Sequence, residues 1–125
     1  MLKEIINKYE DFADALVLAM SFEIDVHSAD SKGKVEIMIH CMNRERDYEW
    51  EKVKLIFEEV LSFRFIENRN TCSVVINTAM IRYEDNEIVF DFFPIILDAD
   101  LKENTESDLI VKCRTIKYIV DPLSL

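Results

Sequence analysis

Residues that could hold a metal or transfer a proton are few in this chain. His27 and His40 are the only histidines among 125 residues. If the intervening chain forms a hairpin that turns near residues 30 and 31, His40 lies opposite about residue 21, roughly 20 Å along the strand from His27. The two rings then cannot share a metal, and the sequence contains no C-x-x-C or H-x-x-x-H spacing. We therefore predict no metal site.

A nucleophile with an adjacent base is also poorly supported. Cys41 follows His40 directly, but adjacent residues of a strand point to opposite faces of a sheet. Cys41, Cys72 and Cys113 are odd in number and widely spaced, which favours reduced, buried thiols over a disulfide framework. The single glycine, Gly33, excludes glycine-rich phosphate loops and dinucleotide fingerprints. We expect no catalytic residues, no enzymatic activity and no cofactor.

Acidic residues suggest two further kinds of site, a calcium loop and a carboxylate pair for glycoside hydrolysis. In the run 98–108, Lys102 and Glu103 stand where a calcium loop needs an oxygen ligand and a glycine, and Leu109 stands where it needs a bidentate glutamate. Carboxylate pairs beside Tyr48 and Trp50 could act on a sugar, but 25 acidic residues form such pairs by chance. We interpret the run as a solvated loop and Trp50 as a core residue.

The charge of the chain favours protein recognition. Lysine and arginine total 15 against 25 aspartate and glutamate residues, which gives a formal net charge of -10. Such a chain repels phosphate backbones and anionic lipid surfaces, so we expect neither a nucleic acid nor a membrane as its partner. A basic protein is a favourable partner. The alternative is that the acidity only maintains solubility.

Length and hydropathy indicate a single domain, residues 1–125, in the cytoplasm. A chain of this length that is 50% hydrophobic can build one core. Its longest apolar runs fall far short of the roughly 18 to 20 residues that a membrane-spanning helix needs. The N-terminus lacks the basic region, apolar stretch and cleavage site of a secretory signal.

Periodicity predicts a short helix followed by a long hairpin. Apolar residues spaced by three and four predict an amphipathic helix over 2–12. A period of two then predicts a strand whose more buried face carries Leu16, Leu18, Met20, Phe22, Ile24 and Val26. A second alternating segment over 35–42 follows the polar loop HSADSKGK, so the two strands form a hairpin.

The segment 51–66, EKVKLIFEEVLSFRFI, fits two elements. As a helix over 49–62 it has one apolar stripe, and the fold would then be more evenly mixed. Its aromatic and β-branched residues, and the alternating segments downstream, favour a strand. We predict a strand over 51–66 with a bulge near Glu58 and Glu59, which returns Leu61, Phe63 and Phe65 to the buried side.

The remaining segments alternate as well. Period-two patterns over 75–83 and 88–92 flank a turn at EDNE, and a further pattern covers 109–120. The predicted class is α+β, mainly antiparallel β, with one N-terminal helix and a curved sheet of five or six strands or a small sandwich. The additional helix at 49–62 is the structural alternative.

Acidic clusters mark the predicted loops and strand ends, where a rigid sheet presents them to solvent. One cluster is Glu45, Asp47, Glu49 and Glu51. The residues we predict to bind a partner are Glu84, Asp85, Glu87, Asp98, Asp100, Glu103, Glu106 and Asp108. Loops at one rim of the sheet would join these carboxylates into one negative surface, and charge would mainly raise the rate of association with a cationic protein.

The order of the hydrophobic segments carries a resemblance. The runs DALVLAMSFEIDV, VEIMIHCMN, WEKVKLIFEEVLSFRF and IVKCRTIKYIV resemble the strand order of small acidic bacterial immunity proteins from polymorphic or contact-dependent toxin systems. The resemblance implies an antidote that covers the active site of a basic toxin, often a nuclease, by presenting carboxylates where phosphates would bind. The alternative from another class is a non-enzymatic binding or structural module, such as a homodimer joined by a strand edge.

Overall fold

The computed structural model describes residues 1–24, 33–67, 75–97 and 100–121. These ranges contain one helix, nine strands and a short 3₁₀ turn. They follow in the order α1 (Leu2–Tyr9), β1 (Ala15–Ile24), β2 (Gly33–Asn43), η1 (Arg44–Arg46), β3 (Glu49–Phe65), β4 (Val75–Ile76), β5 (Met80–Glu84), β6 (Glu87–Asp91), β7 (Ile95–Leu97), β8 (Asp100–Lys102) and β9 (Leu109–Val120).

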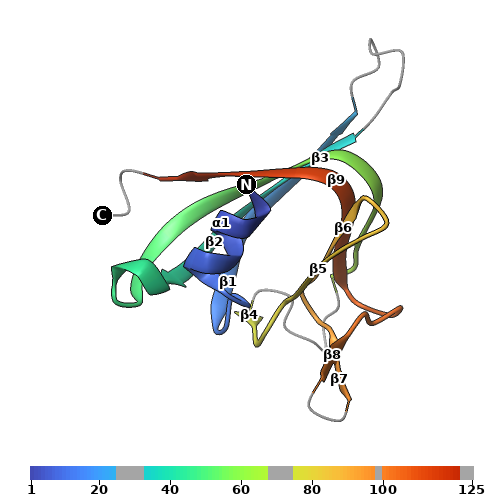
Figure 1. Ribbon diagram of the computed structural model, residues 1–125. Helices are drawn as coiled ribbons and strands as arrows, with labels where there is room; N and C mark the ends of the chain where they lie inside the picture. The colour runs from blue at the N-terminus through green and yellow to red at the C-terminus, as the bar shows by residue number, and fades with distance from the viewer. Residues whose placement is uncertain (25–32, 68–74, 98–99, 122–125) are drawn as a thin grey trace.

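Seven strands form one antiparallel sheet in the order β4-β1-β2-β3-β9-β6-β5, and β7 pairs with β8 in a small second sheet. The two edge strands, β4 and β5, are consecutive in the chain and joined only by residues 77–79. A linker of that length spans at most about 14 Å, whereas the edges of a flat seven-stranded sheet lie about 29 Å apart. The sheet must therefore curl until its edges approach each other, as Figure 1 shows.

This architecture confirms the predicted class of one N-terminal helix with a curved, mostly antiparallel sheet. The strand number is higher than the five or six predicted. The alternating segment 75–83 divides into β4 and β5, which lie at opposite edges, and residues 95–102 contribute the additional β7–β8 hairpin. The turn predicted at EDNE is present, with Asp85 and Asn86 both at positive φ, the geometry of a two-residue hairpin turn.

The helix α1 lies against the concave side of the sheet (Figure 1). It ends at Tyr9, earlier than the predicted Phe12, because Glu10 and Phe12 adopt positive φ angles of 53° that a helix cannot contain. Ile5, Tyr9 and Phe12 are buried there. The described chain contains no helix with the length and apolar character needed to cross a bilayer.

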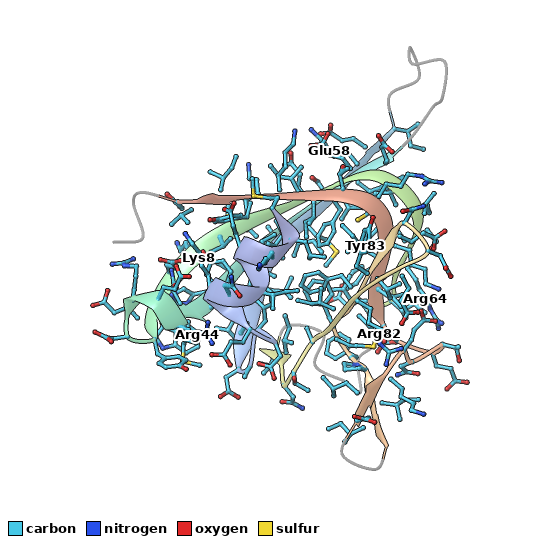
Figure 2. The ribbon with its side chains drawn as sticks, viewed as in Figure 1. Lys8, Arg44, Glu58, Arg64, Arg82 and Tyr83 are labelled. Carbon is cyan, nitrogen blue, oxygen red and sulfur yellow. The ribbon has the colours of Figure 1, made fainter. Side chains whose placement is uncertain are left out.

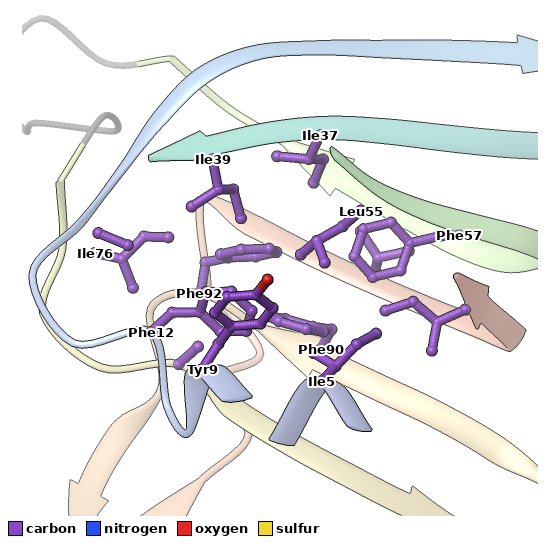
Figure 3. Packing of buried hydrophobic residues seen from close by; sticks show 14 of the residues in the cluster. Ile5, Tyr9, Phe12, Ile37, Ile39, Leu55, Phe57, Ile76, Phe90 and Phe92 are labelled. Atoms are coloured by element: carbon purple, nitrogen blue, oxygen red, sulfur yellow. The ribbon is translucent and has the colours of Figure 1, made fainter. Parts of the chain in front are cut away.

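Aromatic rings fill the space between the helix and the sheet (Figure 3). The ring of Phe90 has its centroid 4.5 Å from that of Phe92, and 5.5 Å from those of both Phe12 and Phe57. All four side chains are fully buried. These contacts join the helix region to β3 and β6, so the core depends on strands that are far apart in the sequence.

The ambiguous segment forms the strand β3, which confirms the predicted strand, and the alternative of a helix over 49–62 is wrong. The predicted bulge is confirmed: Glu59 has φ of 52°, and the pairing with β2 shifts between Val60 and Phe57. A second shift, against β9, follows between Val60 and Ser62. β3 bends in this region (Figure 1), and Glu58 lies on the outer side of the sheet (Figure 2).

The two irregularities change which residues of β3 face the core. Val53, Leu55 and Phe57 are buried at the expected spacing of two, and Val60 and Phe63 follow at spacings of three. The prediction that Leu61 and Phe65 are buried is therefore wrong, because these side chains are 42% and 36% exposed. Each extra residue moves the inward positions by one along the strand.

The first hairpin forms as predicted, but the predicted buried face of its first strand is wrong. β1 pairs with β2 as expected, but Leu18 is an extra residue between Val17 and Ala19 and is exposed. Phe22 and Ile24 are exposed as well, Leu16 and Met20 are half-buried, and Val26 lies outside the described residues. The register places His40 opposite Leu16, not residue 21 as expected. The strand extends past the core, so its distal residues are not covered.

The central phenylalanine of the core provides a test of this arrangement. Phe90→Ala should lower the free energy of unfolding by about 3 to 5 kcal/mol, because it removes a fully buried ring and leaves a cavity. Phe65→Ala is the matched control and should cost less than about 1 kcal/mol. Urea unfolding followed by circular dichroism measures both. Equal losses would contradict the described orientation of β3.

Candidate functional site

The predicted partner-binding carboxylates fall into two groups. Glu84, Asp85 and Glu87 lie at the turn between β5 and β6. Asp100, Glu103, Glu106 and Asp108 lie on β8 and in the loop that leads to β9, beyond the other end of β6, whereas Asp98 lies outside the described residues. The two ends of β6 are separated by about 14 Å, and Figure 1 shows the two regions apart. The structure does not bring these residues together into one rim.

Salt bridges reduce the charge of both groups. The carboxylate of Glu103 lies 3.0 Å from the Lys112 ammonium, and that of Glu84 lies 4.0 Å from the Arg82 guanidinium. Asp85, Asp100 and Glu106 are exposed. That these residues bind a partner stays a prediction.

A groove of about 530 Å³ lies between α1 and the edge strand β5. One wall is formed by Ile6, Glu10 and Asp11, from the helix and the turn after it. The opposite wall is formed by β5, including Ile81 and Arg82, and Leu101 of β8 and Arg44 of η1 complete the lining. Arg44 lies beside the helix and Arg82 on the side of β5 in Figure 2. The groove has the size of a ligand or peptide site.

The polar side chains of the groove are held by neighbours. The Thr78 hydroxyl donates a hydrogen bond of 2.7 Å to Asp11. The Tyr48 hydroxyl donates to Glu10 at 3.1 Å, and the Arg44 guanidinium lies 3.8 Å from the same carboxylate. Arg82 donates to the carbonyl oxygen of Leu101 at 2.7 Å. These contacts orient the walls, and each arginine already has a carboxylate partner.

The groove is suited to binding. Its described lining residues contribute carboxylates, guanidinium groups and apolar side chains, and none contributes an imidazole, a thiol or a hydroxyl nucleophile. Across the described ranges, no three histidine, cysteine, aspartate or glutamate side chains are arranged to hold a metal ion. A lining that combines apolar and charged side chains favours recognition of a partly apolar ligand.

Glu51 is the most buried carboxylate beside α1, and its contacts show a structural role. It is 1% exposed, whereas the sequence placed it in a surface cluster with Glu45, Asp47 and Glu49. The Tyr9 hydroxyl donates to it at 2.6 Å, the Asn43 amide at 2.9 Å and the Arg46 guanidinium at 2.8 Å. A buried carboxylate with three donors is satisfied and fixed. Glu51 therefore ties the helix to the β2–β3 hairpin.

Asp91 is a second buried carboxylate with a structural role. Its two oxygens accept hydrogen bonds from the backbone amides of Phe93 and Asn104, at 3.0 and 2.8 Å. The Asn104 side chain also donates to the Phe93 carbonyl oxygen at 3.0 Å. These bonds fix the base of the β7–β8 hairpin, which brings Leu101 to the groove.

The described cysteines are buried in the core. Cys41 and Cys113 are buried free thiols, as predicted, and Cys72 lies outside the described residues.

The side chain of His40 points to the outer face of the sheet, opposite to that of Cys41, and its ring contacts the ring of Trp50 with 5.0 Å between centroids. The prediction of a core tryptophan is wrong, because Trp50 is 42% exposed. The inward position at this point of β3 belongs to Glu51.

Comparison of the chain with protein-family models, curated proteins and solved structures finds no match. The sequence did not reveal the groove, because its lining comes from α1, η1, β5 and β8, which only the curl of the sheet brings together. The sequence contains only a slight indication of this lining. Ile6 and Glu10 are four residues apart and so share one face of the helix.

The contact between Tyr9 and Glu51 predicts a measurable loss of stability. Tyr9→Phe removes one donor from a buried carboxylate and should lower the free energy of unfolding by about 1 to 3 kcal/mol. Tyr48→Phe removes an exposed hydroxyl that also binds a carboxylate and should change it by less than about 0.5 kcal/mol. Chemical unfolding of both variants gives the comparison. Similar values would contradict the role assigned to Glu51.

The buried thiols predict alkaline destabilisation. Burial raises the pKa of Cys41 and of Cys113 from about 9 to about 12. Because the unfolded thiols ionise first, this contribution to stability is complete below pH 9 and is lost as pH rises towards 12. Between pH 8 and pH 10, the free energy of unfolding should fall by about 3 kcal/mol more in the native protein than in a Cys41→Ala, Cys113→Ala variant, because each thiol contributes about 1.4 kcal/mol. Urea titrations at the two pH values measure this difference, and equal slopes would contradict it.

Proposed function

We propose that the protein is a non-enzymatic inhibitor of the immunity type, which binds and neutralises a cationic partner protein in the cytoplasm. The observation that carries the proposal is the excess of carboxylates around the groove between α1 and β5. Glu10 and Asp11 line it, Asp100 precedes the lining residue Leu101, and Glu84 contacts the lining residue Arg82. Counted in the same way, these four carboxylates are accompanied by three cationic groups, because Arg44 and Arg82 line the groove and Lys102 follows Leu101.

The electrostatics support a protein partner with basic residues. The net charge of -10 attracts a cationic surface over a distance of about one Debye length, roughly 8 to 10 Å at moderate salt. Charge of this kind raises the association rate and selects against acidic partners. The groove then supplies apolar contact area, which charge alone does not. Both features belong to an inhibitor that must capture its target quickly.

The titratable groups in the interior support a binding role over a catalytic one. Glu51 and Asp91 are held by hydrogen bonds that stabilise the fold. The raised pKa of Cys41 and of Cys113 keeps both thiols protonated near neutral pH, which makes them poor nucleophiles. The buried cysteines also agree with a reducing compartment such as the cytoplasm.

A homodimer joined by a strand edge is the competing proposal. The free edge of β5 is the feature that favours it. Two copies would each bring a charge of -10 and the same carboxylates to the contact, and this repulsion opposes self-association. A cationic partner removes the repulsion, so we favour it.

The product of the gene adjacent to that of this protein provides the test. We expect it to be cationic, to arrest growth when expressed alone, and to be harmless when this protein is coexpressed. Binding without growth arrest would overturn the immunity role and leave a binding module. Absence of binding at low salt would overturn the proposed partnership as a whole.

Matched charge variants locate the contact. Glu10→Gln with Asp100→Asn should slow association by a factor of about five or more, because Glu10 lines the groove and Asp100 precedes the lining residue Leu101. Glu36→Gln with Glu58→Gln changes the net charge equally at residues salt-bridged to lysines away from the groove, and should have a smaller effect. Stopped-flow or surface plasmon resonance measures the rates at several salt concentrations. Equal effects would move the contact away from the groove.

A further inference from the structure

The strand β5 has one hydrogen-bonding edge that the rest of the sheet does not use. Among the described strands it pairs with β6 alone. Glu84 and Glu87 flank a two-residue turn, so Glu84, Arg82 and Met80 exchange backbone hydrogen bonds with β6. The N–H and C=O groups of Ile81 and Tyr83 therefore point away from β6, towards the open edge.

A contact just before β5 agrees with this alternation of backbone groups, in which every second residue points away from β6. The amide of Ala79, two residues before Ile81, donates a hydrogen bond of 2.6 Å to the carbonyl oxygen of Asp11. The turn after α1 thus occupies the first position of the open edge. Ile81 and Tyr83 continue the same row, and no described backbone group pairs with them there. An unpaired row of this kind is a template for another strand.

The groove provides a place for that strand. Ile81 lies in its lining, opposite the helix residue Ile6, whose side chain is 39% exposed. An extended chain paired with β5 would lie about 4.8 Å from it, between the strand and the helix. Alternate side chains of that chain would then face the apolar lining, which includes Ile6, Ile81 and Leu101.

The charges select the kind of segment. Glu10 and Asp11 on the helix side, with Glu84 and Asp100 next to the lining residues Arg82 and Leu101, number four against three cations, Arg44, Arg82 and Lys102. Each arginine is within 4.0 Å of a carboxylate of this chain. A segment with lysine or arginine complements this surface, whereas an acidic segment or a second copy of this chain does not.

We propose that β5 binds an extended segment of the partner protein, with alternating basic and apolar residues, as an additional strand of the sheet. The inference rests on the proposed function for the identity of the partner as a cationic protein. It adds the mode of binding, in which backbone hydrogen bonds to Ile81 and Tyr83 hold the segment and the carboxylates select its charge.

An acetylated, amidated peptide of sequence KVKVKV is the probe for the isolated full-length protein. In ¹H–¹⁵N NMR titrations, the amide signals of Ile81 and Tyr83 should shift most, and nuclear Overhauser contacts should join them to the backbone of the peptide. The peptide EVEVEV should bind at least about tenfold more weakly. Failure of KVKVKV to shift these signals would overturn the inference.

Substitutions at Tyr83 distinguish the contribution of its backbone amide to binding from that of its side chain. Tyr83→Pro removes the outward amide and spares the pairing with β6, because proline is tolerated where an edge N–H faces solvent. Tyr83→Thr keeps the amide and removes the same ring. We expect the dissociation constant for KVKVKV to rise about tenfold more in Tyr83→Pro than in Tyr83→Thr. Retained signals of β6 and β9 in both variants show that the fold is intact.

The remaining outcomes distinguish this inference from the proposed function. Equal binding by the two Tyr83 variants would overturn strand addition, even if the adjacent gene product still binds. Shifts of Ile81 and Tyr83 that depend on protein concentration without peptide would show a second copy as the occupant and overturn the proposed segment. Peptide binding at the edge with no binding of the adjacent gene product would support the strand site and overturn the immunity role.

Discussion

The curvature of the sheet is the constraint on which the rest of the structure depends. Only three residues link the two edge strands, so the seven strands must bend around a common axis. The extra residues of β1 and β3 allow this bend, because each interrupts the regular ladder and increases the local twist. The concave side is then narrow enough for one short helix and a cluster of phenylalanine rings to fill it.

The same curvature generates the groove. α1 has only eight residues and packs towards β2, β9 and η1, so it does not reach β5 along its whole length. The turn that follows α1 makes one backbone hydrogen bond to Ala79, directly before β5, and then leads away into β1. The space that remains is bounded by a helix on one side and a strand edge on the other. The proposed binding site consists of backbone groups of a strand edge and nearby charged side chains, and such a site needs neither a motif nor a fixed spacing in the sequence.

Sequence patterns were sufficient for the class of fold and insufficient for the orientation of many side chains. The alternation over 35–42 and 109–120 identified real strands, and the turn at Asp85 and Asn86 follows from residues that tolerate positive φ. Leu61 and Phe65 were assigned to the wrong face, because an inserted residue reverses the alternation after it and leaves little trace in the sequence.

The candidate site could be predicted less well than the fold. Glu51 belonged to an acidic run, and only the packing of Tyr9, Asn43 and Arg46 around it shows that it is internal. The groove required the juxtaposition of α1 and β5, which are about 70 residues apart in the chain. The prediction of a cationic partner rests on the net charge alone, which does not depend on the fold.

The pairing of β3 with β9 has a consequence for how the chain acquires its structure. β1, β2 and β3 are neighbours in both sequence and space, so their hairpins require only short loops to close. β9 must return across the 43 residues 66–108 before it can pair with β3, and only then can the β5–β6 hairpin join the strands β1, β2 and β3 through β9. Loop closure of that length costs entropy before it gains contacts. A nascent chain would therefore hold three ordered strands with an apolar surface uncovered until its C-terminal segment is synthesised, and during that interval chaperones have a substrate to protect.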